Sequence, residues 1–145
     1  MTTHPEQNRG YADRWRAGVA AAQKASAHNA TQTPLDHAHL ARYTLGDRAL
    51  ELEILDLFLG EAPLTLNRLR VQAATCPCDA HGWLAGCHTL KGSARAVGAV
   101  DVAAAAERGE KETELTPDRL DGHLVAMGTA LAAATAYISD WREKA

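Results

Sequence analysis

The apolar residues in the last third of the chain recur at alternating intervals of four and three positions. They are Leu120, Leu124, Met127, Leu131, Ala134, Ile138 and Trp141. Such intervals place side chains on one face of an α-helix. Thr116 and Pro117 precede the set, and proline suits the first helical turn because its missing N–H would have no partner there. The pattern predicts a long final helix with one buried face.

A second series with the same spacing lies in the middle of the chain. Its members are Trp83, Cys87, Leu90, Ala94 and Val97. Asp79 stands where it can cap the first turn, and Gly98 stands where helices often end in a left-handed residue. The sequence Cys76–Pro77–Cys78 before the cap is typical of a turn.

Residues 33–74 predict two helices. The first begins at Thr33–Pro34 and ends at Gly46, and Asp47 is expected to cap a longer second helix. The expected buried residues of the second helix are Leu50, Ile54, Leu57, Phe58, Leu66 and Leu69. Pro63 lies inside it and has no N–H to donate, so we expect a kink or a break there.

Another helix is expected from about Ala99 to Thr113, with Asp101 in its positive first turn. Four long helices with short connections predict an all-α fold, an antiparallel four-helix bundle over residues 33–145 preceded by a short helix. Residues 1–32 are expected to form an N-terminal extension or linker. In it Tyr11, Trp15, Val19 and Ala22 recur at helical spacing, which leaves open whether the extension contains a helix.

Composition excludes several classes of function. The net charge is −3 and the pI is about 6.1, so no basic surface is expected for nucleic acid. No apolar run reaches the roughly 18 residues of a membrane span. Three cysteines are an odd number and do not form a disulfide framework, which favours a reducing cytoplasm.

His88 is the main candidate for chemistry. At about 100° per residue it points away from the apolar face of its predicted helix, with Lys91, Gly92 and Arg95 beside it. A neutral imidazole can attack phosphorus, and Lys91 and Arg95 can supply charge for phosphoryl oxygens. Because the chain has no Gly-rich nucleotide loop, His88 would receive its phosphoryl group from another protein.

The string His88–Ala94 (HTLKGSA), followed by Gly98–Ala99, closely resembles the signature of histidine-containing phosphotransfer (HPt) domains. The resemblance extends over about residues 34 to 115. In that family the Nε2 atom of the motif histidine exchanges a phosphoryl group with an aspartate of a receiver domain. The resemblance implies that His88 is the phosphoacceptor, that Lys91 assists the phosphoryl oxygens and that Gly92 leaves space for the receiver.

The resemblance also implies roles for three neighbours. Glu110 falls where some family members place a polar side chain against the imidazole Nδ1, although an ordinary solvated helix residue is the alternative. Leu84 and Ala85 would lie near His88 as part of a receiver-docking surface, although Leu84 could instead belong to the rim of the core.

The implied partners are response-regulator receiver domains, a histidine kinase or both. The chain would be a stoichiometric phosphocarrier and not an enzyme, a monomer without a cofactor of its own, because the receiver holds the Mg²⁺. No kinase or receiver segment is recognisable in the chain, so it resembles free-standing HPt proteins.

Two other interpretations stay open. The sequence groups Cys76, Cys78, His81, Cys87 and His88, and thiolates with imidazoles bind Zn²⁺, although Cys-x-Cys is unusual spacing for such a site. Alternatively, the chain is an HPt fold that binds partners without transferring phosphate.

Overall fold

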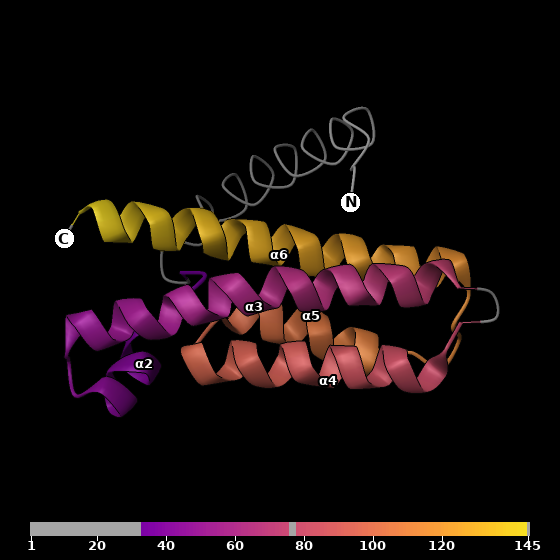
Figure 1. Cartoon of the computed structure of the whole chain (residues 1–145), viewed down its shortest axis with the longest axis horizontal. Coiled ribbons are helices and arrows are strands. Elements are labelled where there is room, and N and C mark those ends of the chain that lie inside the picture. Colours follow the sequence, from indigo (N-terminus) through magenta and orange to yellow (C-terminus); the bar gives the residue numbers. More distant parts are fainter. Residues whose placement is uncertain (1–32, 76–77, 145) are drawn as a thin grey trace.

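The computed structural model describes residues 33–75 and 78–144. These residues form helices and no strand: α2 (His37–Thr44), α3 (Arg48–Ala74), α4 (Ala80–Val97), α5 (Val100–Glu110) and α6 (Pro117–Glu143). Figure 1 shows the four longer helices side by side, with α2 at the end where α3 begins and α6 ends. The predicted all-α bundle is confirmed. The division at residue 32 and the helix predicted around Trp15 stay predictions, because residues 1–32 lie outside the described part.

Side-chain caps fix the starts of three long helices where the sequence predicts them. Asp47 accepts from the N–H of Leu50, Asp79 from that of Gly82, and Thr116 from that of Arg119. Each cap satisfies a backbone donor that has no partner inside the helix.

The predicted start of α2 at Thr33–Pro34 is wrong. The helix begins at His37, and its cap is Asp36, whose carboxylate accepts from the N–H of His39 at 3.1 Å. An aspartate cap satisfies a free N–H, whereas Pro34 is buried in the segment before the helix.

Two expectations for α3 are wrong in part. The helix passes through Pro63 without a break, because residues on both sides of Pro63, such as Ala62 and Leu66, are held in the core, and the kink named as the alternative stays a prediction. Leu50 and Leu57 are exposed, whereas Leu55 and Phe58 are buried. A leucine-rich helix has more apolar residues than one face can bury, so the neighbouring helices decide which face turns inward.

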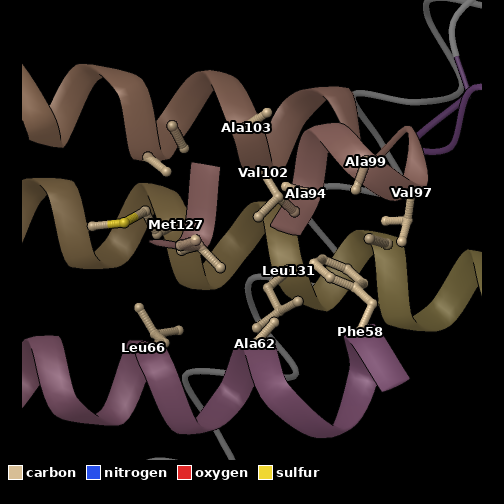
Figure 2. Packing of buried hydrophobic residues seen from close by; sticks show 14 of the residues in the cluster. Phe58, Ala62, Leu66, Ala94, Val97, Ala99, Val102, Ala103, Met127 and Leu131 are labelled. Carbon is tan, nitrogen blue, oxygen red and sulfur yellow. The ribbon is translucent and has the colours of Figure 1, made fainter. Parts of the chain in front are cut away.

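The core lies between all four long helices (Figure 2). α5 contributes mostly alanines, which allow the neighbouring helices to approach closely. On α4, a Cβ at Gly86 would lie 2.6 Å from the Cδ2 atom of Leu69, so glycine permits the close contact between α3 and α4.

The helix predicted to reach Thr113 ends at Glu110, although Asp101 does lie in its first turn. Beyond the helix, the Glu112 carboxylate accepts from the N–H groups of Thr113 and Glu114 and turns the chain toward α6. None of the described helices is long and apolar enough to cross a membrane.

Candidate functional site

His88 lies near the middle of α4 on the face that points away from the core. Its side chain is 72% exposed, while Cys87 and Leu90 on the same helix are buried. Caps at Asp79 and Gly98 hold both ends of α4, so the imidazole stands on a well-anchored helix.

Glu110, the last residue of α5, connects two residues of α4. Its Oε1 atom lies 3.3 Å from the Nδ1 atom of His88, and its Oε2 atom lies 2.8 Å from the Nζ atom of Lys91. Lys91 is largely covered, with 15% of its side chain exposed. The hydrogen bond from Lys91, and to a smaller extent the one from His88, lowers the pKa of Glu110 below its ordinary 4.5.

A buried tryptophan holds the end of α5 against α4. The indole N–H of Trp83 donates to the carbonyl of Gly109 at 2.9 Å, one residue before Glu110. Gly109 has little room for a side chain, because a Cβ there would lie 3.1 Å from the Sγ atom of Cys87. The core thus determines where the Glu110 carboxylate stands.

The Glu110 contact decides which nitrogen of His88 is free. An ionised carboxylate can only accept, so of the two neutral tautomers the contact favours the one with its hydrogen on Nδ1. The Nε2 atom of that form carries a lone pair, and it belongs to an exposed side chain. The arrangement can present an imidazole nucleophile to another molecule.

The remaining predicted site residues are only partly brought together. Gly92 is exposed, and a Cβ there would meet nothing within 4 Å, so open space lies one turn from His88. Leu84 and Ala85 are exposed on the turn before it. Arg95 instead pairs with Glu107 at 3.3 Å.

Sequence reasoning missed Trp83 and Glu107 as residues that shape this region. A buried tryptophan needs an acceptor for its indole N–H, which was a usable signal. No such signal pointed to Glu107, because its pairing with Arg95 depends on how α4 and α5 cross.

The interpretation as a zinc site gains no support from the described residues. Burial, and to a smaller extent the Glu110 carboxylate, raises the pKa of the Cys87 thiol to about 12, so it stays protonated at neutral pH. Cys87 and His88 lie on opposite faces of α4, and Cys76 lies outside the described part. Within that part no three Cys, His, Asp or Glu side chains are grouped as metal ligands.

Comparison with known proteins identifies the family. The model of the Hpt domain family matches residues 53–140, which is more than half of the chain and includes α4, α5 and most of α3 and α6. Neither the curated proteins nor the solved structures gave a match. The family match and the helical bundle agree with the resemblance seen in the sequence, and the chain belongs to the Hpt domain family.

Proposed function

We propose that the chain accepts a phosphoryl group on the Nε2 atom of His88 and passes it on to a receiver domain. Hpt domains are phosphocarriers of phosphorelays rather than enzymes. The observation that carries the assignment to His88 is the 3.3 Å contact between its Nδ1 atom and Glu110, combined with the exposure of the ring.

The transfer needs only groups that the two proteins supply. The lone pair of Nε2 attacks the phosphorus of an aspartyl phosphate, a nitrogen–phosphorus bond forms, and the bond to the aspartate oxygen breaks to leave a carboxylate. The ring keeps its Nδ1 hydrogen and becomes positively charged. The Glu110 carboxylate, 3.3 Å away, stabilises that charge.

Lys91 has two roles in this proposal. It holds Glu110 in place through the 2.8 Å ion pair, and it lies about one helical turn from His88, where its positive charge can assist the phosphoryl oxygens. Arg95 would have to leave Glu107 in order to assist, so we assign it the weaker contribution. Gly92, Leu84 and Ala85 leave an open, partly apolar surface on which a receiver can dock.

The proposed partners are receiver domains, with a histidine kinase at the start of the relay. Mg²⁺ would be held by the receiver, and the chain would need no cofactor of its own. A cytoplasmic place of action fits such partners.

The direct test is transfer of radiolabel from a phosphorylated receiver domain to the purified chain. We expect an acid-labile, alkali-stable label that disappears in His88→Ala. The matched control is His81→Ala, which removes another exposed histidine from the same helix and should be labelled like the wild type. A label that persists in His88→Ala would refute the assignment.

Glu110→Ala tests the role of the carboxylate. We expect slower labelling, because the ring loses the group that orients it and stabilises its charge. Glu114→Ala, an exposed glutamate after α5, is the control and should leave the rate unchanged. Equal rates for wild type and Glu110→Ala would show that the contact does not assist transfer.

A further inference from the structure

The outward face of α3 carries a regular row of exposed apolar residues. Of the nine large hydrophobic side chains that are exposed in the described part of the chain, four lie on this helix. They are Leu50, Leu57, Leu64 and Val71, spaced seven residues apart, and we call them the α3 row. Single exposed apolar residues are ordinary, but four of them aligned along one side of a helix indicate a candidate interaction surface.

The spacing of the α3 row indicates what kind of surface it fits. Paired helices bury apolar residues at two positions in every seven, and the α3 row supplies one of the two, which stays in register with a neighbouring helix. The row covers 21 residue steps, or about 32 Å of helix at 1.5 Å per residue. Leu57, Leu64 and Val71 are 57–65% exposed, so the described helices leave most of the row uncovered.

The charges beside the α3 row favour one orientation of a second α3 helix. Exposed Glu53 lies near the beginning of the helix and exposed Arg68 near its end. Two parallel copies would place like charges together. Two antiparallel copies, related by a two-fold axis between residues 60 and 61, would place Glu53 opposite Arg68 of the second copy.

The same axis brings the apolar residues into register. Leu57 would face Leu64 of the second copy, and Leu50 would face Val71. Gly60 would lie at the axis, where it is exposed and a Cβ would meet nothing within 4 Å. A glycine inside a helix costs about 1 kcal/mol relative to alanine, and at the axis its lack of a side chain allows two helices to approach closely.

We propose that a second copy of this chain binds the α3 row and forms an antiparallel, two-fold symmetric dimer. The proposal departs from the expectation of a monomer. It does not depend on phosphotransfer, because His88 and Glu110 lie on α4 and α5. A dimer of this kind would carry two copies of that site.

The mass of the full chain in solution, measured over a range of concentrations by sedimentation, tests the proposal. We expect a dimer that dissociates on dilution, and we expect Leu57→Glu to raise its dissociation constant by about a hundredfold, because both copies would lose a buried leucine. The control is Val125→Glu, which changes a 58% exposed valine on α6 and should leave the dimer intact. Circular dichroism would verify that both variants stay helical.

The orientation is tested by charge exchange and by cross-linking. Arg68→Glu should weaken the dimer, and Glu53→Arg with Arg68→Glu should restore it. Under mild oxidation Glu61→Cys, beside the axis, should form a covalent dimer, whereas Glu53→Cys, two turns away, should not.

The proposal is overturned if the wild type is monomeric at all concentrations. In that case the row would be covered by residues 1–32 or by another protein, and not by a second copy. It is also overturned if Leu57→Glu dimerises as well as the wild type. Efficient cross-linking of Glu53→Cys but not of Glu61→Cys would exclude the antiparallel arrangement.

Discussion

The two faces of α4 have one backbone but very different surroundings. Cys87 is completely buried, whereas the side chain of the next residue, His88, is 72% exposed. The buried face contacts the other helices and determines where α5 stands. The charged side chains of the outer face pair with Glu107 and Glu110 of α5 and do not reach the core, so changes there should alter chemistry or docking and leave the fold intact. Stability and the proposed phosphotransfer are therefore expected to be separable on one helix, and substitutions on each face test this separation.

The largest expected effect comes from Trp83→Ala on the buried face. The substitution removes a fully buried side chain and its hydrogen bond to Gly109, and it should lower the free energy of unfolding by about 3–5 kcal/mol. Denaturant titration measures the change. The control is Leu84→Ala, one residue along on the outer face and 41% exposed, which should cost about 1 kcal/mol or less. Equal losses for the two variants would contradict the contrast between the faces.

Gly92→Ala should change the free energy of unfolding less than Trp83→Ala does, and it should raise it. The position is exposed inside a helix and has open space, so alanine should raise the free energy of unfolding by up to about 1 kcal/mol. The same change at Gly98 should destabilise the fold, because φ is +81° and a Cβ would lie 2.7 Å from the carbonyl oxygen of Asp36. A bulkier Gly92→Leu should keep a stable fold and slow the transfer from a receiver. Thermal melts and transfer rates of the three variants measure these effects.

The smallest expected effect is a pH dependence from Glu110 on the outer face. Since hydrogen bonds from Lys91 and then His88 lower its pKa in the folded chain, the ionised contact stabilises the fold above pH 4.5. That contribution is lost as the pH falls through the lowered pKa. The difference in Tm between wild type and Glu110→Gln should therefore be steady near neutral pH and shrink in acid. Lys91→Gln removes the hydrogen bond that lowers the pKa of Glu110 most, so it should weaken this pH dependence of the Tm. An unchanged pH dependence would show that Lys91 does not hold the carboxylate.

The sequence predicts α4 and α6 well because their apolar series leave one choice of buried face and their caps are explicit. It predicts the buried face of α3 poorly. There the apolar residues surround the helix, and only the positions of α4 and α6 decide that Leu55 is buried and Leu57 exposed.

The candidate site shows the same division. The outward direction of His88 follows from spacing within one helix. The shared contact of Glu110 with His88 and Lys91 depends on where α5 ends and how it crosses α4, which no local pattern encodes. Family resemblance pointed to Glu110 but not to its ion pair with Lys91.

The end of α4 has a consequence for the order of folding. The carbonyl of Gly98 accepts from the N–H of Asp36 at 2.8 Å, so the left-handed residue that ends α4 also binds the residue that caps the start of α2. α4 and α5 are separated by two residues and can associate through local contacts, whereas Asp36 is more than 60 residues away from Gly98 along the chain. Local contacts form with less loss of chain entropy than distant ones. We therefore expect α2 to dock late in folding, onto a helical hairpin whose turn is already made.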